Sequence, residues 1–472
     1  MQRMPYSEVL FHPLSFADSS GRLFWWEGQL YRAISAERAP LYRWLFDEGI
    51  AQRLINRGLL VETEPASFQL DGYEMILQHR KLPFVSYPYE WSAAMLKDAA
   101  LTVINLEIEL AQYGLSLQDA HPWNVLFVGP NPVHVDFGSI VSAETSASWL
   151  AYGEFCRFFV YPLHLMAQGY GRIARWLLHD YNEGVLKSDL VAVTPRSTLS
   201  LRIESVAKKL LSMTKQNVPR PFRPGLKKAL ALVKATVLRL SSVTPSRLEF
   251  LQQVRQEVED ITITSLKTEW SEYYDGCFLS FLPSDEWTAK HISVHKALSD
   301  LGPGSVLDIG SNRGWYSQLA ALRGSQVVAF DVDEACIAQL YYDAKEKRLP
   351  ILPLVMDFTN PSPGYGLCNQ QLAPAIERFN CDMVLALALV HHLVFKQRLN
   401  FDQIIDGLSI FVKRWLLVEF IPGDDRYVHE WWSERFAWYT LDNFTGALKK
   451  RFHDVKILPS YPDPRVLLLC EK

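Results

Sequence analysis

The fold of the C-terminal half is decided by the stretch Val306-Leu307-Asp308-Ile309-Gly310-Ser311-Asn312-Arg313-Gly314-Trp315-Tyr316-Ser317, which an apolar run follows as far as Asp331. The apolar residues before Gly310 predict a buried strand, the two glycines a tight turn, and the residues after Gly314 a helix. The second apolar run and its acid complete the nucleotide-side half of a doubly wound sheet. The sequence therefore predicts a site for an adenosine-containing cofactor.

The charge of this turn selects the kind of cofactor. Asp308 stands two residues before the first glycine, where a carboxylate would repel the pyrophosphate of a bound dinucleotide. Asn312 occupies the middle of the turn, where a dinucleotide site needs a glycine so that the backbone can approach the pyrophosphate. S-adenosylmethionine has no phosphate and carries an ammonium and a sulfonium. The sequence therefore favours this methyl donor over NAD.

The order of the following elements points to the same fold. The patterns predict helices over 334–347, 370–379, 401–412 and 441–451, and strands over 351–357, 383–389, 415–421, 454–458 and 465–470. With the two strands of the opening stretch, the count is seven. Residues 285–472 thus resemble the class I S-adenosylmethionine-dependent methyltransferases. The resemblance implies an α/β, Rossmann-like, seven-strand methyltransferase domain.

The resemblance also implies which residues hold the donor. Asp308 would bind the ammonium side, Asp331 would accept hydrogen bonds from the ribose hydroxyls, and Asp357 with Phe358 would border the adenine. Asp331 and Asp333 have an alternative role as strand-end and helix-capping acids. The complete set expected at the donor is Asp308, Gly310, Asn312, Gly314, Asp331, Asp333, Asp357 and Phe358.

Catalytic residues are harder to predict because a sulfonium is already an activated leaving group and positioning supplies much of the acceleration. The pattern places His391 and His392 at the end of the fourth strand as candidate bases, and Glu419 as a second candidate substrate contact. Adjacent strand residues face opposite sides, so we expect no metal shared by the two histidines. Packing of the histidines and a surface-capping role for Glu419 are the alternatives. No Asn/Asp-Pro-Pro-Tyr element follows the strand, which disfavours methylation of nucleic-acid bases.

The composition bounds the whole chain. Its 472 residues, 49% of them hydrophobic, and its net charge of −4 predict two or three domains with full cores and give no global argument for nucleic acid. Six cysteines without Cys-x-x-Cys spacing indicate reduced thiols. Residues 1–30 lack a signal-peptide pattern, and no apolar run reaches the roughly 18 residues of a membrane span. We therefore expect a cytoplasmic protein with no transmembrane segment.

The N-terminal part has its own pattern of elements. Residues 23–26 and 29–34 predict a hairpin, Asp71-Gly72 predicts a second hairpin, and a long helix is expected from Ala93 to Tyr113 with Gly114 as its stop. Asp119, Asn124 and the Asp136-Phe137-Gly138 element then follow at the spacing of a kinase catalytic loop. Residues 15–190 resemble protein kinases, and specifically the aminoglycoside-phosphotransferase branch.

This second resemblance implies an α+β kinase-like domain with Asp119 as base and with Asn124 and Asp136 as ligands of Mg beside ATP, if the module is active. The first half departs from the kinase pattern, because it has no Gly-x-Gly-x-x-Gly loop and no lysine inside a strand-like run. Arg32 is the nearest cationic substitute, and Leu117 stands where kinases have histidine. Phosphoryl transfer depends on positive charge around the phosphates. We therefore favour a non-catalytic module and keep an active phosphotransferase as the alternative.

Between these regions the chain is basic. Residues 201–248 contain eleven lysines and arginines against one acid, Glu204, which predicts a helical connector whose basic face contacts a polyanion or only solvent. We also expect Trp287 to cover the donor site, with packing in the core as its alternative role. The predicted organisation is a kinase-like domain over 1–195, a basic connector over 196–265 and a methyltransferase domain over 266–472.

The arrangement resembles that of nodulation-associated methyltransferases. It implies methyl transfer to an unidentified small-molecule or glycan acceptor, with the kinase-like module in substrate binding or regulation. The alternatives are a phosphotransferase or nucleotide-sensing protein whose methyltransferase half only binds the donor, and a scaffold with neither activity.

Overall fold

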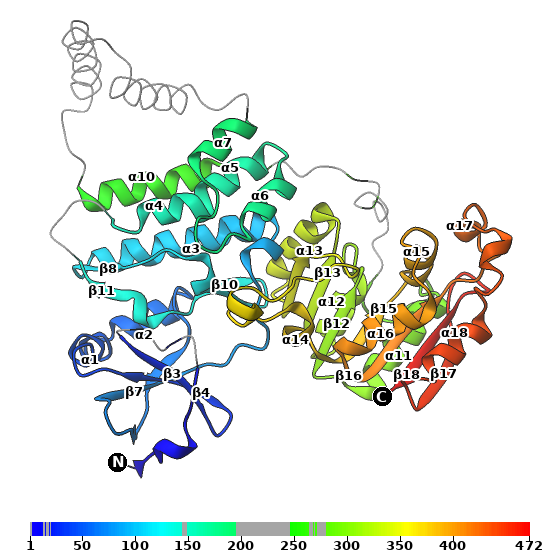
Figure 1. The fold of residues 1–472 in the computed structure, drawn as a ribbon, viewed down its shortest axis with the longest axis horizontal. Coiled ribbons are helices and arrows are strands. Elements are labelled where there is room, and N and C mark those ends of the chain that lie inside the picture. The colour runs from blue at the N-terminus through cyan, green and yellow to red at the C-terminus, as the bar shows by residue number, and fades with distance from the viewer. Residues whose placement is uncertain are drawn as a thin grey trace, which may run out of the picture. The chain divides into compact units, whose positions relative to one another are not determined.

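The computed structural model describes residues 2–12, 15, 18, 20–143, 149–194, 246–263, 268, 270 and 280–472 (Figure 1). Packing divides the chain into unit 1, comprising Met1–Ala99, Val125–Val135 and Ser265–Lys472, and unit 2, comprising Ala100–Asn124 and Asp136–Thr264. The domain boundaries at 195 and 265 remain a prediction. Most of the basic connector, residues 201–245, lies outside the described part of the chain.

A seven-stranded sheet forms the centre of the C-terminal part of unit 1. Its strands run in the order β14-β13-β12-β15-β16-β18-β17, parallel except for β18, which is antiparallel to both neighbours. All seven predicted strands are present. Their bounds are β12 Ser305–Ile309, β13 Gln326–Asp331, β14 Ile351–Val355, β15 Cys381–Ala386, β16 Val412–Phe420, β17 Asp454–Pro459 and β18 Val466–Glu471.

Helices cover both faces of this sheet (Figure 1). One face carries α11 Ala289–Leu301, α12 Trp315–Leu322 and α13 Glu334–Glu346, and the other carries α16 Phe401–Phe411, which packs against α14 Ala375–Arg378 and α18 Leu441–Leu448. The predicted helix over 370–379 is wrong in length, because α14 begins only after Pro374. Proline disfavours helical backbone in the residue before it and is well suited to a helix start.

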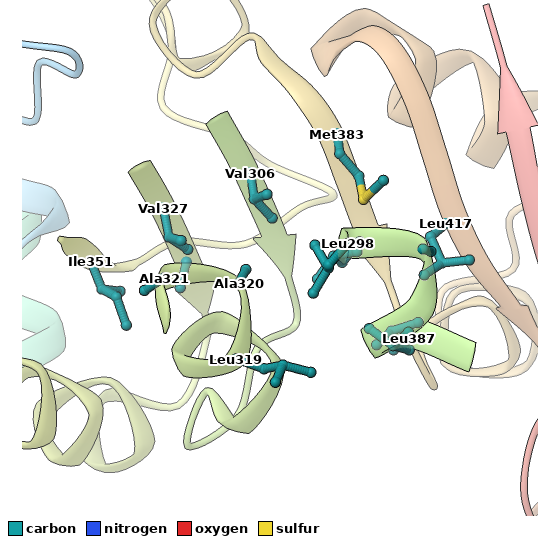
Figure 2. Close-up of a cluster of buried hydrophobic side chains, with 14 of the residues drawn as sticks. Leu298, Val306, Leu319, Ala320, Ala321, Val327, Ile351, Met383, Leu387 and Leu417 are labelled. Carbon is teal, nitrogen blue, oxygen red and sulfur yellow. The ribbon is translucent and has the colours of Figure 1, made fainter. Parts of the chain in front are cut away.

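A cluster of buried apolar side chains lies between the sheet and its first helical face (Figure 2). Val306, Val327 and Met383 point from neighbouring strands toward Leu298 of α11 and Leu319 of α12. Every second residue of a strand points to this face, as Val327 and Ala329 do in β13, because side chains alternate between the two faces of a sheet. Trp287 belongs to this cluster, with only 6% of its surface exposed. Its packing role is therefore confirmed, and its covering of the donor stays a prediction.

The strand order places a ligand site at the edge of this sheet. Because β12 pairs with β13 on one side and with β15 on the other, the direction in which the chain adds strands reverses at β12. In open parallel sheets, ligands bind outside the carboxyl ends of the strands at such a reversal. The turn that follows β12 is the glycine-containing turn of the opening stretch.

The N-terminal part of unit 1 contains a five-stranded sheet in the order β2-β3-β4-β7-β5. The predicted first hairpin is confirmed, but the hairpin at Asp71-Gly72 is wrong. Strand β7 is already paired with β4 and β5, so β6 pairs with β1 instead. The bounds are β1 Gln2–Arg3, β2 Leu10–Phe11, β3 Gly21–Trp26, β4 Gln29–Ile34, β5 Thr63–Pro65, β6 Phe68–Gln69, β7 Met75–His79, β9 Val125–Val128, β10 Asn131–His134, α1 Ala39–Asp47 and α2 Ile50–Asn56.

Unit 2 is mainly helical. The predicted long helix is confirmed as α3 Ala93–Ala111, which begins in unit 1 and continues into unit 2, and Gly114 follows it with a φ of 70°. None of the described helices is long and apolar enough to cross a membrane. The remaining elements are β8 Leu115–Leu117, β11 Ile140–Ser142, α4 Tyr152–Phe155, the π-helix Cys156–Val160, α5 Tyr161–Ala167, α6 Gly171–Leu177, α7 Lys187–Val193 and α10 Arg247–Asp260.

Candidate functional site

The turn after β12 depends on left-handed backbone at three positions. Gly310, Asn312 and Gly314 have φ values of 70°, 51° and 68°. Asparagine tolerates this region better than most residues, and glycine adopts it without steric cost. A Cβ atom on Gly314 would also lie 2.5 Å from a methyl carbon of Leu340. The glycines therefore let the turn pack closely against α13 and leave its amides at the carboxyl end of β12.

Asp308 lies just before this turn and is buried, with 3% of its surface exposed. Its Oδ2 accepts a hydrogen bond of 2.5 Å from the Ser317 hydroxyl on α12. Burial raises the pKa of Asp308 to about 6, and the bond from Ser317 opposes that rise. A cation placed beside the carboxylate would favour its ionised form.

Asp331 is the last residue of β13, and backbone groups orient its carboxylate. One oxygen accepts from the amide of Asn312 at 2.8 Å and the other from the amide of Asp333 at 2.9 Å. Burial raises the pKa of Asp331. Each carboxylate oxygen keeps a second lone pair for another donor. Asp331 is thus suited to hydroxyl groups, and its role at the ribose stays a prediction.

Asp333 acts as a helix cap. Its Oδ1 accepts from the amides of Ala335 and Cys336 at 2.9 and 3.2 Å, and its Oδ2 accepts from the Thr268 hydroxyl at 2.6 Å. The capping alternative therefore describes Asp333 and not Asp331. Donor contact by Asp333 remains a prediction, and these bonds use much of its accepting capacity.

Asp357 and Phe358 follow β14, and Asp357, like Asp333, bonds to residues just after it in the chain. Asp357 Oδ1 accepts from both the amide and the hydroxyl of Thr359, at 2.7 and 2.8 Å, which closes a local turn. Phe358 is half-buried, and its ring lies against Gly407 of α16. Both residues stand at the carboxyl edge of the sheet, where the sequence predicted an adenine border.

Two residues of this edge escaped the sequence-based prediction. Ser311 Oγ is buried and has no hydrogen-bond partner among the described residues. Val332 is 65% exposed although it lies between Asp331 and Asp333. A buried hydroxyl without a partner costs free energy unless a ligand satisfies it. The only sequence signal for Ser311 is its position after Gly310, and the only one for Val332 is its position between two acids.

These groups fit S-adenosylmethionine. The carboxylates of Asp308 and Asp331 offer acceptors for an ammonium and a diol, Ser311 offers an unsatisfied hydroxyl, and Val332 offers apolar surface. A phosphate at the same turn would face the Asp308 carboxylate once that group ionises. The donor set therefore suits a cationic adenosine compound better than a dinucleotide.

The sequence-based position of the two histidines is wrong. Strand β15 ends at Ala386, and Ala388 has a φ of 52°, so the chain turns before α15 Val390–Phe395 begins. His391 and His392 thus belong to a helix, and their ring centroids lie 4.1 Å apart. The argument from opposite strand faces does not apply. Among the described residues no group of three or more histidine, cysteine or acidic side chains is arranged to hold a metal ion.

His391 is the more deeply placed of the pair, with 4% exposure, and its Nδ1 has no partner in the described part of the chain. Its ring lies nearly parallel to that of Trp431, with centroids 6.2 Å apart. Burial lowers the pKa of His391 to about 2, and cationic neighbours including Arg465 and Lys396 add to the effect. Burial lowers the pKa of His392 to about 4. Both imidazoles are therefore neutral at pH 7.

Glu419 is fully buried near the end of β16, which contradicts the surface-capping alternative. Its carboxylate accepts from Lys290 Nζ and from the Ser460 hydroxyl, each at 2.6 Å, and from the Ala388 amide at 2.9 Å. The last bond holds the left-handed residue that precedes α15. Because these donors already surround it, Glu419 is better suited to positioning the histidine helix than to accepting a substrate proton.

In unit 2 the structure brings the kinase-like residues together. Asn124 donates to Asp119 Oδ1 at 2.7 Å, and Asp136 caps its own turn by accepting from Gly138 N at 3.1 Å. Burial raises the pKa of Asp119 to about 6, and the carboxylates of Asp136 and Glu154 add to the rise. The structure therefore brings Asp119 and Asn124 into direct contact and places the carboxylate of Asp136 near enough to act on Asp119.

A cavity of about 590 Å³ opens beside Asp119. Side chains of both charges line it: Asp119 and Glu154 are acidic, and Arg157 and Lys187 are basic. In unit 1, Arg32 is 4% exposed and its guanidinium pairs with Asp18 at 2.6 Å. The phosphate-holding lysine of active kinases is also paired with a carboxylate, so this pairing is compatible with Arg32 as the cationic substitute.

The doubly wound sheet, with its acids at the ends of β12 and β13, defines an α/β fold of the methyltransferase type. The chain is similar to the nodulation protein NoeA of Rhizobium meliloti strain 1021, with 27% identity over 455 residues, which cover 93% of this chain and 91% of the relative. The predicted resemblance to nodulation-associated proteins is thereby confirmed. No protein-family model matches the chain.

Solved structures resemble parts of the chain at low identity. They include the bifunctional kinase-methyltransferase WbdD (16% identity, 44% of this chain and 42% of that one, TM-score 0.31) and magnesium protoporphyrin IX methyltransferase ChlM from Synechocystis PCC 6803 with bound SAM (15%, 44% and 100%, 0.29). The N-methyltransferase NodS from Bradyrhizobium japonicum WM9 is a third (12%, 38% and 93%, 0.28). The chain spans about two fifths of the WbdD chain. The assignment of the fold therefore rests on the sheet topology.

Proposed function

We propose that this protein is an S-adenosylmethionine-dependent methyltransferase that acts on an unidentified acceptor and releases S-adenosylhomocysteine. The observation that carries the proposal is the edge of β12 and β13, where Asp308 and Asp331 flank a left-handed turn that contains the unpartnered Ser311 hydroxyl. Hydrogen-bonding groups of this kind, at the reversal point of a doubly wound sheet, suit an adenosine ligand with a positive end.

Each group has a separate task in this proposal. Asp308 would bind the ammonium and Asp331 the two ribose hydroxyls, while Val332 would cover one face of the adenine. The donor supplies a methyl group that is already activated by the sulfonium. The protein then needs chiefly to hold the acceptor atom in line with that methyl group and to exclude water.

His391 is the candidate base for a hydroxyl acceptor. Its imidazole is neutral, and its Nδ1, which has no partner among the described residues, can accept a hydrogen bond from that hydroxyl when it is the unprotonated ring nitrogen. Because its pKa is lowered to about 2, His391 would orient the hydroxyl more than it would take up its proton. Burial is the main cause of the lowered pKa of His391, and two of the cations that add to it, Arg465 and Lys290, are each paired with a carboxylate, of Asp425 and Glu419. Trp431 provides an aromatic surface beside the ring. A hydroxyl group of a small molecule or glycan could lie beside the Nδ1 atom of His391 and the ring of Trp431.

Calorimetry on the purified full chain tests the proposal. We expect S-adenosylmethionine to bind and NAD to fail to bind, and Asp331→Ala to weaken donor binding at least about tenfold because hydrogen bonds to a charged group contribute roughly 1.5–3 kcal/mol each. Binding of NAD with no response to the methyl donor would refute the proposal. Mass spectrometry of a lysate incubated with the protein and isotope-labelled donor would then identify the acceptor.

For the kinase-like module we propose a role in substrate binding or regulation without phosphoryl transfer. The absence from the sequence of a glycine-rich loop and of a lysine inside a strand-like run supports it. The cluster of Asp119, Asn124 and Asp136 favours the second candidate, an ATP- and Mg-dependent phosphotransferase or nucleotide sensor. Titration with ATP and Mg, each alone and together, separates them. Binding that Asp136→Ala abolishes would favour the second candidate.

A further inference from the structure

An N-terminal segment of unit 1, residues 84–98, is bonded to the donor-binding half of the same unit. Arg378, at the end of α14, is 4% exposed and forms two hydrogen bonds to the carboxylate of Glu90, which is 1% exposed. The same guanidinium donates to the Val85 carbonyl at 2.6 Å, and the Tyr87 hydroxyl accepts from the Ala373 amide at 3.1 Å. A buried pair with this many bonds fixes the segment firmly.

The segment also reaches α13, the helix that begins three residues after Asp331. Glu334 Oε1 accepts a 3.0 Å hydrogen bond from the amide of Ala93, the first residue of α3. Farther along both helices, the Tyr341 hydroxyl donates to Asp98 at 2.6 Å, and the Tyr341 ring is fully buried. The start and the middle of α13 are therefore both attached to the N-terminal segment.

Glu334 is connected to the donor-binding acids by a short chain of backbone bonds. Asp333 donates its amide to Asp331 and caps α13 through Ala335 and Cys336, so the loop and the first turn of the helix form one hydrogen-bonded group. Glu334 is the first residue of that turn. Its bond to Ala93 attaches this group to the N-terminal segment.

We propose that Glu334 is a positioning residue for the methyl donor and that residues 84–98 are a structural part of the donor site, although they precede the methyltransferase fold by nearly 200 residues. The proposal rests on the proposed function above. Loss of the Glu334 bond leaves the orientation of Asp331 less restricted, and a loosely held contact group binds its ligand more weakly. Residues 84–98 thereby set the affinity of the C-terminal half for its donor.

Three variants of the full chain test this proposal. Glu334→Ala should raise the dissociation constant of S-adenosylmethionine about tenfold, near the lower end of typical coupling between linked groups. Glu334→Gln keeps an amide oxygen as acceptor and should stay close to the wild type. Glu346→Ala removes an exposed glutamate from the other end of α13 and is the matched control. Calorimetry measures the affinity, and circular dichroism measures the thermal midpoint without donor.

Hydrogen exchange measured by mass spectrometry gives a reading that needs no donor. In Glu334→Ala, amides 331–336 should exchange about tenfold faster than in the wild type, while those of 415–420 in β16 stay unchanged. Unchanged exchange, unchanged affinity, a loss in Glu334→Gln equal to that in Glu334→Ala, or unfolding of Glu334→Ala at the assay temperature would each overturn the positioning role. Failure of the wild type to bind donor, with faster exchange in Glu334→Ala, would reject the proposed function alone.

Discussion

Two buried titratable groups, Asp308 and His391, are the residues proposed to contact the donor and the acceptor. Burial favours the neutral form of each, which raises the pKa of the acid to about 6 and lowers that of the base to about 2. At pH 7 the acid is therefore ionised and the imidazole neutral. The ionised acid suits a cationic donor, and the neutral imidazole can accept a hydrogen bond from a protic acceptor.

Donor affinity should depend on pH through Asp308. The ionised carboxylate attracts the ammonium, so affinity for S-adenosylmethionine should rise from pH 5 to pH 7 with a midpoint near 6 and then level off. Asp308→Asn should bind more weakly and lose this midpoint. Calorimetry at half-unit pH intervals measures both effects, and an equally steep rise in Asp308→Asn would contradict the assignment.

Folding stability should depend on pH through His391. Its pKa is about 2 in the folded protein and about 6.5 when unfolded, so the unfolded chain binds one more proton between these values. The stability contributed by the neutral histidine is complete above about 6.5 and is lost as the pH falls. His391→Phe should therefore lose about 2 kcal/mol less free energy of unfolding than the wild type between pH 7 and pH 5. Urea denaturation at the two pH values measures the difference, and identical losses would contradict the prediction.

At the scale of an element, the turn between β12 and α12 depends on two properties of Gly314. Its φ is 68°, and an added Cβ would meet Leu340 at 2.5 Å. Gly314→Ala should therefore destabilise the protein by about 2–4 kcal/mol, the sum of backbone strain and overpacking. Gly302→Ala is the matched control, because Gly302 has a φ of 53° but no neighbour within 4 Å of an added Cβ. It should lose only about 1–2 kcal/mol. Equal losses in urea denaturation would show that the contact with Leu340 is unimportant.

At the scale of the whole molecule, the pair of Glu90 and Arg378 joins residues 288 positions apart within unit 1. Glu90→Ala leaves a buried guanidinium without its carboxylate and should lower the free energy of unfolding by about 3–5 kcal/mol. Glu62→Ala removes an exposed pair with Arg80 and should cost no more than about 1 kcal/mol. Denaturant titration followed by tryptophan fluorescence compares the two. Similar small losses would mean that the buried pair does not stabilise unit 1.

The sequence by itself determined the elements whose signals are local. The glycine turn after Val306–Ile309, the seven strands, the first hairpin and the helix from Ala93 follow from periodicity and from turn residues that act over a few positions. The spacing of Asp119, Asn124 and Asp136 likewise predicted a cluster that the structure brings together. In these cases the neighbouring residues carry the information.

Only the tertiary structure decided the features that depend on distant partners. Strand β7 pairs with β4 and β5, which leaves no edge for β6. Glu419 is buried because Lys290 and Ser460 satisfy its carboxylate. His391 lies on a helix that the bond from Ala388 to Glu419 helps to place. The attachment of Glu334 to Ala93 likewise joins residues 241 positions apart. Burial and hydrogen bonding act through space, so a local pattern does not encode which distant groups satisfy a given side chain.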